Sequence, residues 1–190
     1  PMKQDIHEFI AIGLGPFNLS LACLAEPVAG LNGIFLERNA EFSWHPGMLV
    51  DNTTLQNPFL ADLVSLADPK SRFSFLNYCK EEGKIYSYYF RESFYLTRAE
   101  YTGYCRWAAA QLSNVRFEHE VQEVVHDAER NCYVVTGVRG PKREPFVPPI
   151  IREGSPRMAL TSSIQGPAAL DTIFGRTGAR ARAPRLVTEN

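Results

Sequence analysis

Apolar and polar positions in the first 37 residues follow the order strand, turn, helix, strand. The apolar run Phe9–Ile12 ends at a glycine, which is typical of a buried parallel strand. A glycine-containing turn follows, and Leu19–Ala25 then consists of good helix formers. A second apolar run ends on an acid at Ile34–Glu37. This pattern predicts an α/β fold with a parallel sheet, in which Phe9–Ile12 is central and Ile34–Glu37 lies beside it.

Further elements are predicted up to residue 137. The apolar spacing favours helices at Phe59–Leu66, Ser74–Glu82 and Arg98–Leu112, the last being the most clearly amphipathic. Alternation of apolar and polar residues predicts strands at Val115–Phe117, Val121–Val125 and Tyr133–Thr136. The segment between the last two strands is expected to be the turn of a hairpin.

The pattern changes after Gly137. Seven prolines interrupt the remaining sequence, and only Phe146 and Phe174 of the 22 aromatic residues lie there. The segment holds nine Lys/Arg against four Asp/Glu, whereas the first 137 residues hold 11 against 17. Such a composition does not support a packed core. We therefore expect one domain over residues 1–137 and a poorly ordered Pro/Arg-rich tail over residues 138–190.

The overall composition is that of an ordinary globular protein. Hydrophobic residues make up 45%, charged residues 22%, and the net charge is −1, so neither a nucleic acid nor a membrane surface is predicted as a partner. No apolar run is long enough for a signal peptide or a membrane span, so a cytoplasmic location is expected. The four cysteines are too widely spaced for a zinc site and are expected to be reduced thiols. A homo-oligomer is left open.

The glycine turn is the strongest candidate for a binding site. Gly13 can make a tight turn, and Gly15, which lacks a Cβ, lets the backbone approach a pyrophosphate at the positive end of the following helix. Asn18 occupies the third position of the usual G-x-G-x-x-G pattern, so the match is imperfect. Glu37 ends the next strand, where a carboxylate would accept hydrogen bonds from a ribose. This pattern does not separate FAD from NAD, and a turn without a ligand remains an alternative.

Other sequence features carry less chemistry. Trp44 and His45 lie in a loop, where core packing and a satisfied loop histidine are the simpler explanations. The sequence has no G-x-S-x-G motif, and no Walker lysine follows the glycines. No catalytic residue and no metal ligand is assigned.

Five motifs together resemble one family, over about residues 6–137. The motifs are GLGPFNLS (Gly13–Ser20), FSWHPGM (Phe42–Met48), LQNPFLADLV (Leu55–Val64), FLNY (Phe75–Tyr78) and YCRWA (Tyr104–Ala108). Their order and spacing resemble the flavin-dependent N-hydroxylating monooxygenases that act on lysine and ornithine. Within that family, the similarity is greatest to the putrescine and cadaverine N-hydroxylases of hydroxamate siderophore biosynthesis.

The resemblance implies a fold, two cofactors and a set of contacts. Family members have two Rossmann-like domains, for FAD and NADPH; NADPH reduces the flavin, which then uses O2 to hydroxylate a primary amine. The resemblance also implies which residues contact FAD, from its pyrophosphate and ribose to its flavin ring and its adenine end. These residues are Gly13, Gly15, Pro16, Phe17, Asn18, Glu37, Trp44, His45, Gln56 and Val121.

Two departures from the family pattern affect these expectations. The amino-acid hydroxylases have a lysine that binds the substrate carboxylate where this chain has Ala61, which favours a diamine over lysine or ornithine. The resemblance also stops near Gly137, so the fold is expected to be incomplete relative to the family, and no NADPH site is assigned in this chain. A lysine or ornithine N-monooxygenase, a catalytically inactive flavin-binding fragment and an NAD-binding Rossmann module are the alternatives.

Overall fold

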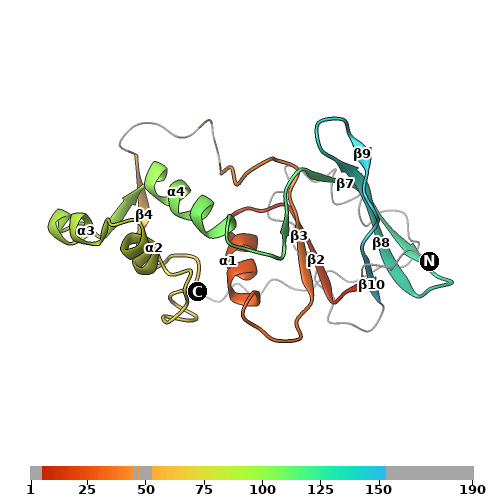
Figure 1. Ribbon diagram of the computed structural model, residues 1–190, viewed down its shortest axis with the longest axis horizontal. Helices are drawn as coiled ribbons and strands as arrows, with labels where there is room; N and C mark the ends of the chain where they lie inside the picture. Colours follow the sequence, from red (N-terminus) through yellow and green to blue (C-terminus); the bar gives the residue numbers. More distant parts are fainter. Residues whose placement is uncertain (1–5, 45–46, 48–52, 153–190) are drawn as a thin grey trace, which may run out of the picture.

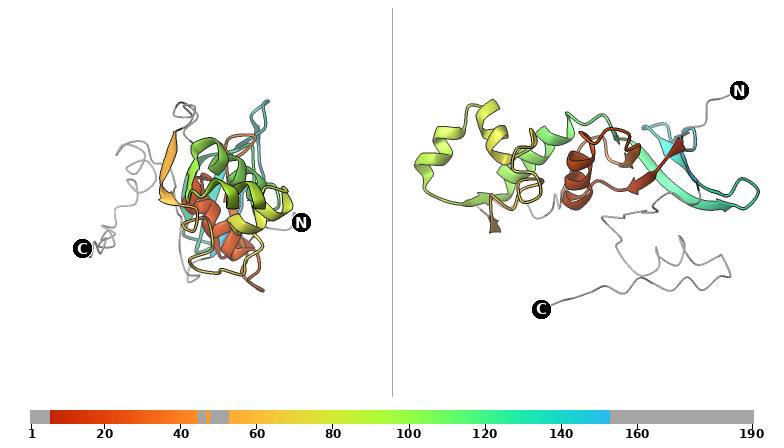
Figure 2. Two further views of the ribbon diagram at one scale, coloured as in Figure 1. Left: turned by 90° about the vertical axis from the view of Figure 1, so that its left-hand side faces the viewer. Right: turned by 90° about the horizontal axis from the view of Figure 1, so that it is seen from below.

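A computed structural model describes residues 6–44, 47 and 53–152, and its elements form three layers (Figures 1 and 2). Helices occupy one side, a parallel sheet lies in the middle, and an antiparallel sheet covers the other side. Within the described residues, no helix is both long and apolar enough to cross a membrane.

The parallel sheet is formed by β2 (Phe9–Ile12), β3 (Gly33–Leu36) and β6 (Val115–Arg116), in the order β2-β3-β6. Helix α1 (Pro16–Ala25) connects the first two strands, and Ile10 pairs with Ile34, so the predicted strand–turn–helix–strand unit is confirmed. The expectation that Phe9–Ile12 is the central strand is wrong. The central strand is β3, because β6 pairs with the edge of β3 that β2 leaves open.

Alternate side chains of the parallel strands enter two different cores. Phe9, Ala11 and Phe35 join the core beneath the helices. The intervening residues Ile10 and Ile34 join a second core with Val135 and other residues of the antiparallel sheet. Because successive strand side chains point to opposite faces, the continuous apolar runs in the sequence reflect a sheet that is covered on both sides.

The antiparallel sheet follows the order β1-β10-β8-β7, with β9 on the edge of β8. Its strands are β1 (Ile6–His7), β7 (His119–Asp127), β8 (Cys132–Arg139), β9 (Glu144–Pro145) and β10 (Ile150–Arg152). Strands β7 and β8 pair from His119↔Arg139 to Asp127↔Cys132, which confirms the predicted hairpin.

The boundary predicted at residue 137 falls inside β8. Phe146, Ile150 and Ile151 are buried, and β10 pairs with both β1 and β8. The expectation that residues 138–152 lack a packed core is therefore wrong, since three apolar side chains anchor a proline-rich segment to the sheet. The rest of the predicted tail, residues 153–190, lies outside the described residues.

The helical layer contains α2 (Phe75–Glu81), α3 (Ile85–Arg91) and α4 (Arg98–Ala109), together with a two-stranded ribbon of β4 (Thr54–Pro58) and β5 (Tyr95–Thr97). The helices predicted within residues 74–82 and 98–112 are confirmed. Their first turns are capped by the side chains of Ser74 and Thr97, the latter in a full capping box.

The helix predicted at Phe59–Leu66 is wrong, because this segment forms turns. The carboxylate of Asp62 accepts hydrogen bonds from the backbone N–H groups of Val64 and Ser65, at 2.9 and 2.6 Å. Such side-chain bonds compete with the regular hydrogen bonds of a helix.

The close packing of β7 on β8 gives a testable consequence at Gly137. A Cβ at this position would lie 2.0 Å from the carbonyl oxygen of Glu120 and 2.8 Å from the ring of Phe146. Gly137→Ala is therefore expected to destabilise the fold by about 2–3 kcal/mol in urea unfolding. Gly103→Ala is the matched control, because its Cβ would meet only the Tyr78 hydroxyl, at 3.5 Å, within helix α4. This control should stabilise the fold by about 0.5–1 kcal/mol, and equal effects of the two substitutions would contradict the packing.

Candidate nucleotide-binding site

The turn between β2 and α1 is held in a conformation that requires glycine. Gly13 has φ of 81°, a left-handed value that costs other residues energy. Its N–H donates to the carbonyl of Leu36 at 2.8 Å, which ties the turn to the end of β3. The bare backbone thus lies at the carboxyl end of the parallel strands, where ligands bind in folds of this class.

Asn18, at the third glycine position of the pattern, hydrogen-bonds the turn. Its side chain is buried, and its Nδ2 donates to the carbonyl of Gly13 at 2.7 Å. The carboxamide therefore closes the turn from the helix side. The expected contact of Asn18 with a cofactor stays a prediction, and in the structure its side chain supports the turn.

Glu37 supports the same turn from the strand side. One carboxylate oxygen accepts from the N–H of Leu14 at 2.6 Å, and the other accepts from the N–H and Nδ2 of Asn39, at 2.8 and 2.6 Å. The side chain is only 7% exposed. A carboxylate offers about four acceptor positions, so these three bonds leave capacity for a ligand hydroxyl. Sequence reasoning missed Asn39, although an amide two residues after the strand-ending acid was a usable signal.

The first turn of α1 faces this backbone cradle without a capping side chain. Gly15 is the N-cap, Pro16 occupies the first turn, and no side chain caps the helix. The positive end of the helix dipole therefore lies beside the glycine turn, an arrangement that favours a phosphate. Phe17, the next residue, is 87% exposed at the same edge.

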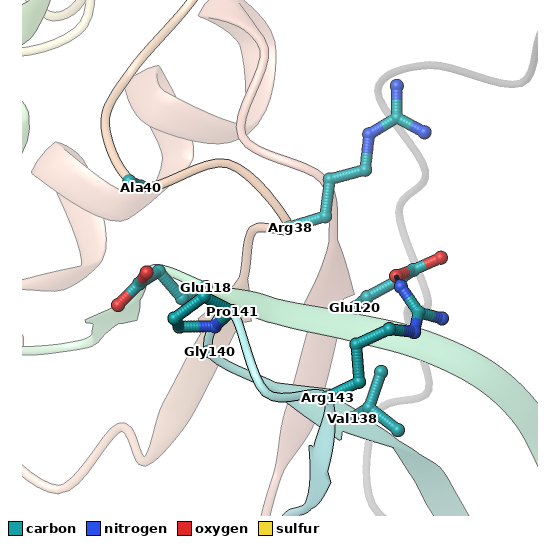
Figure 3. Close-up of a pocket in the computed structure, with 8 residues that line it drawn as sticks. All are labelled: Arg38, Ala40, Glu118, Glu120, Val138, Gly140, Pro141 and Arg143. Atoms are coloured by element: carbon teal, nitrogen blue, oxygen red, sulfur yellow. Dashed lines mark hydrogen bonds and ion pairs between the residues drawn. The ribbon is translucent and has the colours of Figure 1, made fainter.

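A hollow of about 170 Å³ lies where the chain leaves β3 (Figure 3). It is lined by Arg38 and Ala40 on one side and, on the other, by Glu118, by Glu120 of β7, by Val138 of β8 and by the turn that follows β8. The N–H of His119 donates to the carbonyl of Glu37 at 2.8 Å, which joins the hollow to the turn. An ion pair between Arg143 and Glu120, at 2.6 Å, lies at its wall.

The site residues expected from the sequence fall into separate groups. Gly13, Gly15, Pro16, Asn18 and Glu37 are brought together by the hydrogen bonds around the turn. Val121 follows the hollow-lining residue Glu120 in β7 and is partly buried against the second core.

The positions expected near a flavin ring lie on the helical side of the molecule. Trp44 packs edge-on against Tyr101 of α4, with ring centroids 5.4 Å apart, and the guanidinium of Arg98 lies 5.5 Å from its ring. Gln56 is exposed on β4. His45 lies outside the described residues. The structure thus gives Trp44 a packing role and leaves Gln56 accessible.

Ala61 is exposed at the start of a firmly held turn. Its N–H donates to the carbonyl of Pro58 at 2.9 Å, and the adjacent Asp62 accepts from the N–H of Phe75, at the start of α2, at 2.7 Å. The next residue, Leu63, donates its N–H to the buried hydroxyl of Tyr104 at 3.3 Å. Sequence reasoning missed Asp62, whose position before Ser65 is typical of a side-chain-capped turn.

The cysteines do not form a nucleophilic or metal site in the described part of the chain. All four are free and buried. Burial raises the pKa of Cys23 to about 12 and that of Cys79 to about 11, so both are neutral thiols at pH 7. No group of three or more His, Cys, Asp or Glu side chains that could hold a metal ion occurs among the described residues.

The chain is similar in sequence to one family of known proteins. Residues 5–146 match the family model for L-lysine 6-monooxygenase/L-ornithine 5-monooxygenase. An alcaligin biosynthesis enzyme of Bordetella pertussis is 60% identical over 136 residues, which are 72% of this chain and 30% of that protein. A putrescine N-hydroxylase of Shewanella oneidensis is 49% identical over 137 residues, which are 72% of this chain and 28% of that protein.

A solved structure extends the likeness to the fold. The cadaverine monooxygenase DfoA of Erwinia amylovora, crystallised with bound FAD, superimposes with a TM-score of 0.75 at 49% identity, over 77% of this chain and 34% of that one. The chain therefore spans about a third or less of the length of these relatives.

Proposed function

Because the chain belongs to the L-lysine 6-monooxygenase/L-ornithine 5-monooxygenase family, we propose that its glycine turn binds FAD and that it serves the N-hydroxylation of a primary amine. The observation that carries this proposal is the backbone cradle at Gly13. The turn is bare, left-handed and fixed from both sides by Asn18 and Glu37, and it lies against a helix end that no side chain caps.

The residues around the turn fit the adenosine diphosphate part of FAD. The pyrophosphate would lie against Gly13, Gly15 and Pro16, and the remaining acceptor capacity of Glu37 would take a ribose hydroxyl. The hollow beside Arg38 would receive the adenine end, next to the backbone of Val121. The bound flavin supplies the redox chemistry, while the protein binds and orients it.

The amine substrate in this proposal is a diamine such as putrescine or cadaverine. Ala61 is exposed and offers no charge to a substrate carboxylate. The amino-acid hydroxylases, which this stretch resembles, have a lysine at this position. A carboxylate would forgo a charge-assisted hydrogen bond worth about 1.5–3 kcal/mol, whereas a diamine would lose nothing. The likeness to a putrescine N-hydroxylase and to a cadaverine monooxygenase supports this choice.

NADPH would bind to the second Rossmann-like domain of the family fold. The described residues of this chain do not include such a domain. The two glycines nearest the end of that region do not form a second cradle, since Gly137 is inside β8 and Gly140 lies in a turn before Pro141. Neither leads from a strand into a helix, which a phosphate cradle requires.

Turnover measurements test this proposal. With FAD and NADPH, the 190-residue chain is expected to form no hydroxylamine from putrescine, cadaverine, lysine or ornithine above the protein-free control. A chimaera in which residues 6–146 replace the matching segment of the Bordetella pertussis protein is expected to be active, because the two chains are 60% identical over 136 residues. Robust turnover by the chain alone would contradict the assignment of NADPH binding elsewhere. A chimaera that binds FAD but does not hydroxylate amines would instead indicate a catalytically inactive flavin-binding fragment.

A further inference from the structure

Residues from four of the five sequence motifs meet at one hydrogen-bonded junction, which the proposed function does not yet use. Side-chain hydrogen bonds join these residues around the turn that contains Ala61. We call residues 58–65 the Ala61 turn. The residues of the junction are, in chain order, Ser20 of the first motif, Asp62 and Leu63 of the third, Phe75 of the fourth and Tyr104 of the fifth.

The backbone of Leu63 is held on both sides of the residue. Its N–H donates to the hydroxyl of Tyr104 at 3.3 Å, and that hydroxyl donates in turn to the carbonyl of Phe73 at 2.6 Å. The carbonyl of Leu63 accepts a hydrogen bond from the hydroxyl of Ser20. Leu63 is 3% exposed and Tyr104 is fully buried. Because hydrogen bonds are stronger away from water, these contacts fix the place of Leu63 in the fold.

Asp62 makes the rest of the Ala61 turn a single rigid body. Its carboxylate accepts from the N–H groups of Val64 and Ser65 and from the Ser65 hydroxyl, at 2.9, 2.6 and 2.7 Å. It also accepts from the N–H of Phe75 at 2.7 Å. A carboxylate has about four acceptor positions, and these four donors fill them. Asp62 therefore supports the turn and has no capacity left for an amine substrate.

Ser20 joins this rigid turn to the helix that begins at the glycine cradle. It lies in the second turn of α1, whose N-cap is Gly15. Serine and threonine hydroxyls within helices often bond to a carbonyl of their own helix, as Thr102 does with Arg98 at 2.8 Å. The hydroxyl of Ser20 instead reaches a carbonyl 43 residues later in the chain. The bond therefore connects two separate elements and does not serve α1 itself.

We propose that Ser20 is a positioning residue, which sets the distance between the cofactor and the amine substrate. This inference rests on the proposed function, in which the start of α1 binds the FAD pyrophosphate and residue 61 lies beside the amine. Ser20 would act through Leu63, which follows Ala61 by two residues. A displacement of about 1 Å can slow a reaction about a hundredfold. Loss of this one bond should therefore impair hydroxylation and leave FAD binding intact.

Hydrogen–deuterium exchange of the 190-residue chain gives a readout that does not depend on turnover. Ser20→Ala should speed amide exchange in the Ala61 turn about tenfold, because the turn loses its bond to α1. Exchange in β7 and β8 should stay the same. Thr102→Val is the matched control, since it removes a hydroxyl–carbonyl bond that lies within one helix, and it should not alter exchange in the Ala61 turn. Unchanged exchange in Ser20→Ala would overturn the proposal.

Turnover of the active chimaera separates positioning from mere support of the fold. Ser20→Ala should lower kcat/KM for putrescine about ten- to a hundredfold and reduce the hydroxylamine formed per NADPH consumed, with FAD affinity changed less than about twofold. Ser20→Thr keeps the hydroxyl and should recover most of the loss, whereas Thr102→Val should leave the yield of hydroxylamine unchanged. A normal yield in Ser20→Ala would overturn the proposal and leave the proposed function standing. A parent chimaera that hydroxylates no amine would overturn both.

Discussion

Glu37→Ala is expected to lower the affinity of the chain for FAD at least a hundredfold, equivalent to about 2.7 kcal/mol. The carboxylate accepts hydrogen bonds from Leu14 on the glycine turn and from Asn39 on the next segment. Without it, these backbone donors lose their partner in a largely buried place, which costs about 1–3 kcal/mol for each group left unsatisfied. The substitution should therefore loosen the pyrophosphate cradle and also remove the ribose acceptor.

Flavin fluorescence titration and urea unfolding measure the two effects of Glu37→Ala. The free energy of unfolding should fall by about 2–4 kcal/mol. Glu41→Ala is the control, because the Glu41 carboxylate is mostly exposed and pairs only with Arg106 in the described structure. Its effect on unfolding should stay within about 0.5 kcal/mol. Unchanged FAD affinity in Glu37→Ala would show that the turn does not bind the cofactor.

Ala61→Lys is expected to shift the amine preference of the active chimaera toward carboxylate-bearing substrates by about ten- to a hundredfold. The expected gain is one charge-assisted hydrogen bond of about 1.5–3 kcal/mol, since each 1.4 kcal/mol corresponds to a factor of ten. The side chain at position 61 is exposed, and the following turn is fixed through Asp62 and Leu63, so a lysine can be added without repacking the core.

The ratio of kcat/KM values for putrescine and ornithine measures this shift. Before the substitution, the chimaera should prefer the diamine; afterwards, its KM for ornithine should fall while its flavin content stays the same. Ala61→Gln is the control, because it adds bulk and polarity without charge. A chimaera that already prefers lysine or ornithine with Ala61 in place would refute the substrate proposal and leave the family assignment intact.

The sequence predicted those parts of the fold whose pattern is local. The strand–turn–helix–strand unit and the β7–β8 hairpin follow from short apolar runs and their connecting turns. Helices α2 and α4 carry capping residues that are visible in the sequence, at Ser74 and Thr97. In these elements, local preference and tertiary packing agree.

Features that depend on distant contacts could not be predicted. Strand β10 exists because Ile150 and Ile151 find partners in β1 and β8, which no local periodicity reveals among the surrounding prolines. Strand β2 was expected to be central from the strand–turn–helix–strand pattern alone. Its burial comes from the layers on its two faces, whereas the central place in the sheet belongs to β3.

In the candidate site, too, some features could be predicted from the local sequence pattern and others could not. Glycine spacing identified the backbone cradle, but the support of the turn depends on side-chain hydrogen bonds that the glycine pattern does not reveal, one of which joins residues far apart in sequence. Glu37 reaches back 23 residues to Leu14, and its second oxygen bonds Asn39. The sequence also did not reveal that the carboxamide of Asn18 bonds the carbonyl of Gly13 within the turn.

The turn at Gly13 is proposed as an FAD cradle and not as a site for a nicotinamide dinucleotide. Parallel titrations of the wild-type chain and of Gly13→Val with FAD and with NADPH test it most directly. We expect saturable binding of FAD to the wild-type chain and no binding of NADPH at the same concentrations. We also expect loss of FAD binding in Gly13→Val, since valine is excluded at a φ of 81°. Tighter binding of NADPH than of FAD, or FAD binding that survives Gly13→Val, would contradict it.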